Sequence, residues 1–592
     1  MIVKMQELTL LVMNKYGDDA LRKLRKLGVV HINHVRRPHA EGIVAIEHRL
    51  EELKKALFIL SHYKVAEKKE KLDKEKITGC VKDVLSLDKE KGQLQDHLAK
   101  LEIDLTWFKE WGNVAESTLS ELNQCGVYIK LYNCSSKFLK KIDTKKVVYV
   151  LDQQASNIKI ALVSQNPNDS LELIPVKVPD ANLHSVNRKI AVTSAQINDI
   201  NRRLIDAAGN MSCLLRCKKD LLRRLDFFKV KFGMSHGDVF SYLQGFCPKE
   251  SAEGIKTVAQ EEGWGYFFQE PDDLSEVPTL IRNPKWLQII NPVFKFMGIL
   301  PAYNEMDISF WFLFFFSLFF AMLIGDAGYG LIFLILTIVA RKKFPKIESV
   351  PFFLIGVLSC STILWGAVTG TWFGVENIGR LPVFRYFVID KMNSFVGSNQ
   401  TFMMYLCFLV GIIQLTIAHV IKAIRYINSP AALGQVGWIG ILWGLFFVIG
   451  KFVLNNALPS YFPVLMGGGI GLVVLFSHPE KNIIKGQLIA LGNLPLSIIN
   501  SFADLLSYLR LFVIGYVSVM VAASFNDMAM QVGFNNILSG LGAGLILFFG
   551  HALNIVLGLL SVLVHGIRLN MLEFSSHLDV QWAGKDYSPF RE

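Results

Sequence analysis

The sequence predicts a protein of class α+β in two parts, and three observations carry this prediction. Residues 1–300 hold 46 Lys and Arg against 38 Asp and Glu, whereas residues 301–592 hold only 16 against 13. The chain is 51% hydrophobic, and its second part contains apolar runs long enough to cross a membrane. In the first part, apolar residues recur at heptad spacing. We therefore expect two small α/β lobes joined by a long antiparallel coiled coil, followed by an all-α membrane domain of about eight helices.

The two lobes are expected from strand patterns, in which apolar residues alternate or β-branched residues cluster. Such patterns occupy residues 4–12, 28–32, 146–153, 158–165 and both ends of the segment 239–268. The first two, with an amphipathic helix at 18–27 between them, predict the first lobe. The remaining patterns predict a second lobe that uses segments on both sides of the later helices.

The coiled coil is expected from three stretches of heptad-like spacing. Leucines recur at steps of three and four over residues 50–60, and after a charged turn leucines and Phe108 continue at steps of seven, four and three over residues 87–108. Two interleaved apolar series with a period of seven run through residues 190–228. Such spacing places the apolar residues on one side of each helix, so these helices should pair with one another.

Several functional classes find no support in the sequence. Acidic and basic residues alternate along the predicted coiled coil, which favours a solvated helix face over a nucleic-acid surface. There is no phosphate-binding glycine loop, HExxH or GxSxG, so neither nucleotide chemistry nor hydrolysis is indicated. Cys213 and Cys217 lack further metal-ligand partners nearby and are interpreted as ordinary helix thiols. We expect no catalytic residues, no metal and no cofactor.

The second part, residues 301–592, should form the membrane domain. The N-terminus lacks the pattern of a signal peptide, so residues 1–300 are expected in the cytoplasm. Basic residues then concentrate in the cytoplasmic loops at 341–346, 422–425 and 480–485, as the positive-inside rule requires, and both termini are cytoplasmic. The eight apolar runs begin at about residues 308, 329, 350, 402, 436, 461, 487 and 537.

The last two apolar runs are longer than a bilayer needs. Residues 487–523 would make a continuous helix of about 55 Å, against a hydrocarbon thickness of about 30 Å. The run at 537–577 is longer still. These helices must be tilted, kinked at a point such as Pro495, or project from the membrane.

Arg510 is the only Lys or Arg between residues 487 and 525, and Arg568 is similarly isolated in the last run. An arginine at the centre of a membrane helix costs roughly 2.5 to 3.5 kcal/mol, which usually marks a functional residue. Because a guanidinium stays protonated, it acts as a fixed positive charge and not as a proton carrier. Such a charge can attract, repel or discharge a passing carboxylate.

Polar residues form a stripe on each of the last two helices. In the last helix the spacing of three and four joins Gly558 to His551, Asn554, Ser561, His565 and Arg568. In the preceding helix, one face carries Asn500, Asp504, Ser507 and Ser518, with Arg510 at its edge. Because polar stripes at this depth must face protein or water, the two helices should form a hydrated wall crossed by a positive charge.

At this point the chain resembles the membrane subunit called I or a of V/A-type rotary ATPases and ATP synthases. The resemblance runs along nearly the whole chain. It rests on LRKLGVVHI at 24–32, LQGFCP at 243–248, EVPTLIRN at 276–283, LIGDAGYG at 323–330, WGAVTGTWFG at 365–374, SYLRLF at 507–512 and HGIRLNMLEF at 565–574. The last three motifs in combination are the most specific.

The resemblance implies a non-catalytic stator subunit that faces a rotating ring of proteolipid subunits, called c or K. Such a subunit forms two ion half-channels against the ring and couples transport of H⁺ or Na⁺ to rotation. Residues 1–300 would be an arm that docks peripheral stalk subunits of the E and G type, and contact with the central stalk and the ATPase head would be indirect. The remaining partner would be membrane lipid, with no nucleic acid, and the compact external loops favour a prokaryotic plasma membrane.

The resemblance also implies roles for individual residues. Arg510 matches the family's essential arginine, Arg568 its second arginine, and Glu573 an acid of the cytoplasmic ion path. Asn500 and Asp504 match polar channel positions, and with the two stripes they complete a candidate ion path that includes Ser507, His551, Asn554 and His565. The chain departs from some relatives at Gly558 and Ser518, where an acid or a histidine can stand, and at His577, where a lysine often stands.

Each of these residues has a structural alternative. Arg510 could pair with Asp504, although the two lie about 120° apart around a helix. Arg568 could reach to the membrane surface, and Glu573 could be an interfacial acid. His551, Asn554 and His565 could be hydrogen-bond partners in helix packing. Asp326 is interpreted as a turn or capping residue, and Gln414 and His419 as packing groups.

Two other functions remain open. A secondary transporter would bind a small solute at mid-membrane, but it should show internal repeats and broken helices in matching halves, and neither is present in the sequence. A membrane scaffold would account for the charged part of the chain but not for the two arginines. Neither the direction of ATP turnover nor the choice between H⁺ and Na⁺ follows from the sequence.

Overall fold

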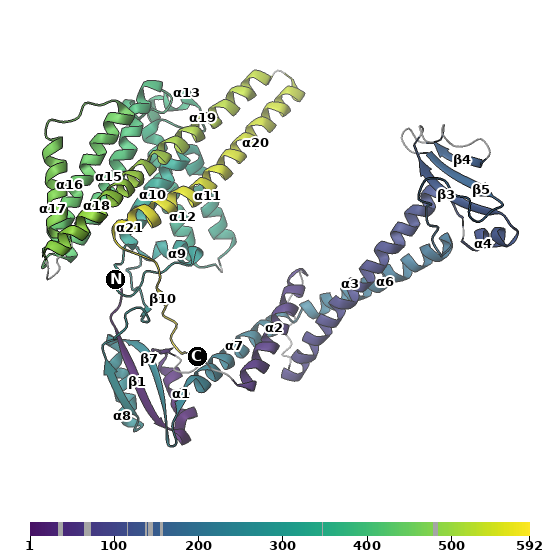
Figure 1. The fold of residues 1–592 in the computed structure, drawn as a ribbon, viewed down its shortest axis with the longest axis horizontal. Helices are drawn as coiled ribbons and strands as arrows, with labels where there is room; N and C mark the ends of the chain where they lie inside the picture. Colours follow the sequence, from purple (N-terminus) through teal and green to yellow (C-terminus); the bar gives the residue numbers. More distant parts are fainter. Residues whose placement is uncertain are drawn as a thin grey trace. The chain divides into compact units, whose positions relative to one another are not determined.

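The structure is a computed structural model of the chain. It describes residues 1–33, 40–63, 73–114, 116–135, 139, 146–153, 158–345, 347–477, 483–534 and 536–591. Lys346 and residues 480–482, which belong to two of the basic loops, lie outside the described residues. The chain divides into two compact units (Figure 1). The first comprises residues 1–10, 27–33 and 244–591, and the second residues 11–26 and 34–243.

The first strands of the chain belong to a sheet with the order β2-β7-β1-β8, with β6 paired to β7. Its strands are β1 (Met5–Met13), β2 (His31–Asn33), β6 (Ser235–His236), β7 (Phe240–Pro248) and β8 (Gly265–Gln269). Near it in the chain lie η1 (Asn14–Tyr16), α1 (Gly17–Leu27), η2 (Lys249–Ser251) and α8 (Ala252–Glu261). Apolar residues alternate along β1, and Leu8, Leu10 and Val12 are buried.

This sheet corrects the predicted division into lobes. The strands at both ends of the segment 239–268 form as expected, but they pair with β1 and β2 and not with the strands at 146–165. The remaining strands make a separate antiparallel sheet of order β3-β5-β4, formed by β3 (Tyr128–Cys134), β4 (Val147–Gln153) and β5 (Ile158–Ser164) beside α4 (Glu116–Gln124). Tyr132 and Ile160 are fully buried in its core.

Four long helices in the second unit contain the heptad residues. They are α2 (Glu41–Ser61), α3 (Lys74–Trp111), α6 (Leu183–Ala208) and α7 (Met211–Gly233). Helix α3 packs on α6 and helix α2 packs on α7, as Figure 1 shows. Leu53, Leu60, Leu204 and Leu214 are buried in the shared core. The predicted pairing of these helices is therefore confirmed, whereas a supercoil remains a prediction.

The apolar half of the chain is helical throughout most of its length. Its longer helices are α10 (Ser309–Ile324), α11 (Ala327–Lys343), α12 (Ser349–Thr369), α15 (Gln400–Arg425), α16 (Ala431–Leu454), α17 (Phe462–Phe476), α18 (Ile483–Ser507), α19 (Leu509–Val532) and α20 (Ile537–Ser561). Short elements are η3 (Gln288–Ile290), α9 (Asn291–Met297), α13 (Glu376–Gly379), α14 (Pro382–Arg385), η4 (Asp390–Met392), η5 (Gly397–Asn399) and α21 (Ser575–His577). Buried phenylalanines, among them Phe312, Phe319 and Phe408, fill the core of the bundle.

The predicted count of eight spanning helices is not confirmed. Within the described residues, five helical segments are long and apolar enough to cross a membrane, and a sixth results if α10 and α11 count as one span. These two helices are bent by 119° relative to each other, and α17 has only 15 residues. The bend falls at Gly325, whose φ of +70° ends α10 in the left-handed region that glycine adopts without strain.

The bend between α10 and α11 is held by Asp326, which is 1% exposed. Its carboxylate caps α11 by accepting hydrogen bonds from the backbone N–H groups of Gly328 and Tyr329. It also accepts from the N–H groups of Phe373 at 2.9 Å and Gly374 at 2.8 Å. The interpretation of Asp326 as a capping residue is confirmed, and the same carboxylate joins the motifs at 323–330 and 365–374.

The last two helical segments are long, as predicted: residues 484–532 form one and residues 537–577 the other. Helix α18 continues through Pro495, and the interruption lies instead at Tyr508, between α18 and α19. The last segment contains two π-helical turns, at Val562–Gly566 and Leu569–Phe574. Such turns insert extra residues into a helix and rotate the following side chains around its axis.

The C-terminal segment runs from the last helix back onto the sheet, within the first unit. Strand β10 (Lys585–Asp586) pairs in parallel with β9 (Pro278–Thr279). The Tyr587 hydroxyl donates a hydrogen bond to the Val29 carbonyl at 2.6 Å, and the Phe590 N–H donates to the Val30 carbonyl at 2.8 Å. A continuous run of backbone thus connects the helix that carries Arg568 to strand β2.

Candidate functional site

Two arginines from the last two helical segments lie close to one carboxylate, that of Glu573. Arg510 Nη2 donates a hydrogen bond to Glu573 Oε1 at 2.8 Å. Arg568 Nε lies 3.6 Å from the same oxygen. The Glu573 side chain is 3% exposed, that of Arg510 27% and that of Arg568 52%. The sequence motifs at 507–512 and 565–574 therefore come together in space.

The breaks in the two helices position these groups. Arg510 follows the interruption at Tyr508, and its Nε donates to the Ser507 carbonyl at 3.1 Å. Glu573 lies inside the second π-helical turn, where Arg568 is the residue just before it. The second carboxylate oxygen of Glu573, Oε2, is buried and has no hydrogen-bond partner among the described residues. It remains available as an acceptor.

The break at Tyr508 is itself fixed by a buried amide network. The Tyr508 hydroxyl donates to Gln414 Oε1 at 2.9 Å, and Gln414 Nε2 donates to Asn570 Oδ1 at 3.0 Å. All three side chains are fully buried. A buried network in which donors and acceptors match holds its helices in one arrangement. Gln414 is thus a packing group, as the sequence indicated.

Glu573 also lines an open cleft of about 610 Å³. The wall includes the predicted site residues Asn500, Asp504, Ser507 and Arg568. The other lining residues are His419, Lys422, Gln435, Trp438, Ser497, Ser501, Ala503, Leu572, Ser576, His577 and Asp579. Five of the nine predicted residues thus share one cleft, and Arg510 reaches it through its bond to Glu573.

A chain of side chains crosses one wall of this cleft. His577 Nε2 lies 3.2 Å from Asp504 Oδ2, and His577 Nδ1 lies 3.0 Å from His419 Nε2. His419 Nδ1 lies 2.8 Å from Gln435 Oε1. Asp504 therefore pairs with His577 and not with Arg510, which removes the structural alternative considered for this arginine.

The two histidines and Gln435 were not predicted as site residues from the sequence. His419 and Gln435 stand on α15 and α16, far from the charged motifs in sequence, and His419 was interpreted as a packing group. His577 was noted only as a departure from the family pattern. One signal was present: His577 follows Glu573 by four residues, which is about one helical turn.

Two other predicted residues, His551 and Asn554, lie in a second polar network. The Tyr329 hydroxyl contacts His551 Nδ1 at 2.7 Å, and Asn554 Nδ2 donates to the same hydroxyl at 3.1 Å. His551 Nε2 contacts Asn526 Oδ1 at 3.1 Å, and Ser518 Oγ donates to Asn554 Oδ1 at 3.2 Å. These bonds join α11, α19 and α20, as expected for residues that pack helices together.

The polar stripe predicted for the last helix therefore divides. His551 and Asn554 belong to the second network, whereas Arg568 lies beside Glu573. His565 Nδ1 is buried without a partner among the described residues, and Ser561 donates only to Leu557 of its own helix. The reason is the first π-helical turn, which begins after Ser561 and breaks the 3.6-residue period on which the stripe was predicted.

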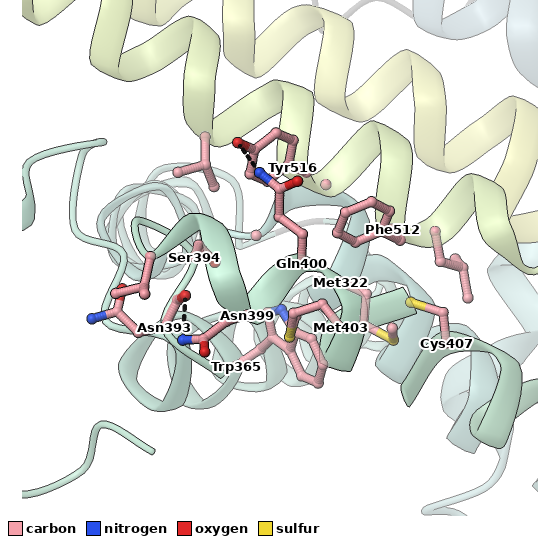
Figure 2. A pocket seen from close by; sticks show the side chains of 15 residues that line it. Met322, Trp365, Asn393, Ser394, Asn399, Gln400, Met403, Cys407, Phe512 and Tyr516 are labelled. Atoms are coloured by element: carbon pink, nitrogen blue, oxygen red, sulfur yellow. Dashed lines mark hydrogen bonds between the residues drawn. The ribbon is translucent and has the colours of Figure 1, made fainter. Parts of the chain in front are cut away.

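A small, mainly apolar cavity of about 30 Å³ lies between α10, α12, α15, α19 and residues 393–399 (Figure 2). Gln400 Nε2 donates to the Tyr516 hydroxyl at 2.7 Å above this cavity, as Figure 2 shows. Asn393, Ser394 and Asn399 also line it. The volume is enough for one or two water molecules. In the described part of the chain, no group of three His, Cys, Asp or Glu could hold a metal ion.

Comparison with known proteins gives relatives over the whole chain. A V-type ATP synthase subunit I from Borreliella burgdorferi is 31% identical over 610 residues, covering 100% of both chains. The V-type ATP synthase subunit I 1 of Treponema pallidum is 27% identical and also covers 100% of both chains. An A-type ATP synthase subunit I of Methanocaldococcus jannaschii is 24% identical and covers 91% of this chain and 85% of its own. A scan against protein-family models finds no match.

Among the solved structures that align with the chain is one cytoplasmic domain. It is the cytoplasmic N-terminal domain of subunit I, homolog of subunit a, of V-ATPase, with 14% identity over 45% of this chain and 100% of its own. The TM-score of this alignment is 0.26.

Proposed function

The chain belongs to the subunit I family of V- and A-type ATP synthases, and we propose that it forms two ion half-channels against a rotating ring. Membership makes it a membrane subunit of a multi-subunit rotary complex, with a role in ion transport. The proposal adds how it acts: as a non-catalytic stator that couples movement of H⁺ or Na⁺ to rotation of a proteolipid ring. The observation that carries the proposal is the partly exposed Arg510, which is bound to Glu573. Along its helix, Arg510 lies between Asp504, which faces the open cleft, and Ser518, which belongs to the network around Tyr329.

The order of polar residues along the helices supports two separate half-channels. Asp504 precedes Arg510 by six residues and faces the open cleft, whereas Ser518 follows it by eight, about 12 Å further along the helix, and lies in the second network. In the last helical segment the order reverses, because Asn554 precedes Arg568 and His577 follows it. Along each helix, an arginine thus lies in sequence between a residue of the Tyr329 network and a charged or imidazole side chain of the cleft.

The surface around Arg510 supports a docking site for the ring. The last helical segment is the least covered of the five, with 22% of its apolar window buried, against 33 to 44% for the others. Its exposed large side chains include Leu553, Val556, Leu557, Leu560, Leu563 and Val564. An apolar helical surface beside a partly exposed arginine suits a ring of membrane helices that bring carboxylates past it.

The charge of Arg510 explains how transport would couple to rotation. A ring carboxylate that faces lipid is neutral, because desolvation disfavours its charged form. Opposite Arg510 the carboxylate is stabilised as an anion, so its ion leaves into one half-channel. The next ion enters from the other half-channel, after the carboxylate has passed the arginine. Since Arg510 cannot carry a proton, it blocks direct leakage between the two half-channels.

We further propose that residues 1–300 form a cytoplasmic arm that docks the E- and G-type peripheral stalks, with residues 301–592 in the membrane. The long paired helices of the second unit give such an arm its length, and both termini would be cytoplasmic. Contact with the central stalk and the ATPase head would then pass through these stalks. The positive-inside distribution of basic loops supports this orientation.

The test is ATP-driven ion transport by the purified complex reconstituted into liposomes. Arg510→Ala and Arg510→Gln should abolish transport while the complex still assembles. Arg385→Ala, which removes an exposed arginine from α14, serves as the matched control and should transport normally. Native mass spectrometry should show the ring and the ATPase head bound to every variant. Full coupled transport by either Arg510 variant would contradict the proposal.

A further inference from the structure

An open groove lies between α11 and α12, which pack side by side (Figure 1). Its volume is about 490 Å³, and most of its lining is apolar, including Leu334, Ile338, Phe352, Phe353 and Leu364. The Phe353 side chain is 56% exposed and that of Leu364 69%. The groove is therefore open at the surface of the helical bundle.

One end of the groove carries a positive charge. Arg341, in the last turn of α11, lines the groove, and its guanidinium carbon lies 5.2 Å from the centre of the Phe353 ring. Among the described residues Arg341 forms no ion pair with a carboxylate. Lys342 and Lys343 follow it and are exposed. The groove thus begins at a guanidinium whose charge is not balanced by an acidic partner in the described part of the chain.

The rest of the groove has no charged lining residue. On α12 it extends from Phe352 to Leu364, which is 12 residues further and about 18 Å along the helix. One leaflet of a bilayer is about 15 Å deep, half of a hydrocarbon thickness of about 30 Å. The groove is therefore about as long as one leaflet is deep, with its charge at one end only. A phospholipid has the same order of groups, a charged phosphate followed by apolar acyl chains.

A second apolar groove, of about 590 Å³, lies between α12 and α10. The two grooves share Val357, Ser361 and Leu364, so they meet along the middle of α12. A lipid with two acyl chains can place one chain in each groove, whereas a molecule with a single chain fills only one of them. The joined grooves therefore suit a lipid with two chains.

We propose that the joined grooves beside α12 bind one anionic phospholipid, with its phosphate at Arg341 and its acyl chains along α12. The chains gain little by leaving the bilayer, because lipid tails are as apolar as leucine. The head group therefore decides which lipid is retained. A guanidinium donates two parallel hydrogen bonds to a phosphate, and basic pockets between spanning helices bind anionic head groups. A zwitterionic lipid binds more weakly, because its own ammonium group competes for the phosphate. This site is independent of Arg510 and of the ring.

Gly356 offers a way to close the groove without disturbing the helices. It lines the groove, and a Cβ atom there would meet nothing within 4 Å. A leucine at this position would occupy the space that an acyl chain needs, and leucine is favoured over glycine within a helix. Gly467 on α17 is the matched control. A Cβ atom at Gly467 also meets nothing within 4 Å, and this residue lines neither groove.

The test uses the full-length chain, purified in detergent and incubated with phosphatidylglycerol or phosphatidylcholine, with retained lipid counted by native mass spectrometry. One molecule of phosphatidylglycerol should be retained at least about fivefold more tightly than phosphatidylcholine. Arg341→Gln should weaken binding of phosphatidylglycerol about fivefold, the contribution of one basic residue near a membrane surface, and should not alter binding of phosphatidylcholine. Gly356→Leu should remove the retained lipid, while the melting temperature of the lipid-free chain stays the same or rises.

Two control variants should bind lipid as the unaltered chain does: Gly467→Leu, and Lys451→Gln at the exposed end of α16. A phosphatidylglycerol with a photoreactive acyl chain locates the site, and the crosslinks should concentrate in peptides from residues 334–341 and 349–369. Equal retention of the two lipids, unchanged retention in Arg341→Gln or Gly356→Leu, or crosslinks spread evenly over all spanning helices would each overturn the proposal. The bound lipid would then be ordinary surrounding lipid only.

Discussion

Arg510 and Glu573 are 63 residues apart in sequence, yet they form a 2.8 Å ion pair in which the carboxylate is almost fully buried and the guanidinium is partly exposed. The arginine thus keeps a strong partner inside the chain while part of its charge faces outward. A carboxylate arriving from outside would compete with Glu573 for the same guanidinium. Under the proposed function, this competition would let Arg510 bind and release a passing ring carboxylate.

Replacing Glu573 should therefore impair transport. Glu573→Gln keeps the size of the side chain but removes the charge that balances Arg510. A charge-assisted hydrogen bond contributes about 1.5–3 kcal/mol, so a loss of at least about tenfold in ATP-driven transport is expected. The measurement is the initial rate of ion uptake into liposomes.

The control is Glu376→Gln, which removes the acid from the exposed Arg380–Glu376 pair. An exposed ion pair contributes at most about 1 kcal/mol, so this variant should transport at the normal rate. Equal rates in both variants would show that the charge of Glu573 is not needed.

Removing the Asp326 carboxylate should destabilise the membrane bundle in graded steps. Asp326→Ala leaves four backbone N–H groups without their acceptor, whereas Asp326→Asn keeps Oδ1 and loses only the acceptor for Gly374. Each lost bond to a charged group costs about 1.5–3 kcal/mol. The melting temperature of the purified subunit or complex should fall more in the alanine variant than in the asparagine variant.

Asp527→Asn changes an exposed acid on α19 and should leave the melting temperature unchanged. If asparagine and alanine at position 326 have equal effects, the number of hydrogen bonds is not what stabilises the bend. Since this carboxylate joins residues 326–329 to residues 373–374, its loss should also reduce assembly of the complex.

Gly515 should not tolerate even a methyl group. A Cβ atom there would lie 2.2 Å from the backbone oxygen of Met322, where α19 approaches α10. Backbone cannot move aside as a side chain can, so Gly515→Ala must push the two helices apart. The expected results are a lower melting temperature and weaker transport, because α19 carries Arg510.

Gly492→Ala is the matched control on α18, since a Cβ atom at position 492 meets nothing within 4 Å. Alanine is favoured over glycine in a helix by about 1 kcal/mol, so this variant should be as stable as the unaltered protein or slightly more so. A similar loss in both variants would mean that the contact between α19 and α10 is unimportant.

The thiols in the extramembrane part should differ in reactivity. Burial raises the pKa of Cys247 to about 11, and its side chain is 0% exposed, whereas Cys125 is exposed. At pH 8 a maleimide should therefore label Cys125 and leave Cys247 unmodified, as read by peptide mass spectrometry. Because the folded-state pKa exceeds the usual value of 9.0, the stability that protonated Cys247 contributes is present below pH 9 and is lost as pH rises towards 11.

Labelling of Cys247 at pH 8 in the native protein, at a rate near that of Cys125, would contradict the buried position of β7. Labelling of both thiols in denaturant is the control, since unfolding removes the difference in exposure.

Local patterns predicted most of the elements, because periodicity reports how a segment is buried. The alternation at 4–12 and the heptads at 50–60 both correspond to observed burial. Which strands share a sheet was not predictable in this way. Strand β7 joins β1 across more than 200 residues because the paired helices bring the chain back to its start. The pairing of strands so far apart in sequence depends on long-range contacts, which a local sequence pattern does not contain.

The site was predictable where motifs and charge coincided, as at Arg510 and Glu573. The roles of these residues stay predictions, but their placement beside one another agrees with them. His577 and His419 were not predicted as partners, since they come from different helices. The division of the polar stripe on the last helix was also not predictable. A π-helical turn changes the number of residues per helical turn, and the spacing of polar residues in the sequence does not reveal it.

The backbone path from the last helix through β10 to β2 has a mechanical consequence. A flexible tether would let the end of this helix drift when a neighbouring body drags against it. Here the C-terminal segment is instead fixed by hydrogen bonds, because Lys585–Asp586 pair with β9 and the residues after them bond to the carbonyls of Val29 and Val30. If a ring turns beside the helix that bears Arg568, as proposed above, sideways load on that helix would pass through these hydrogen bonds into strands β9 and β2.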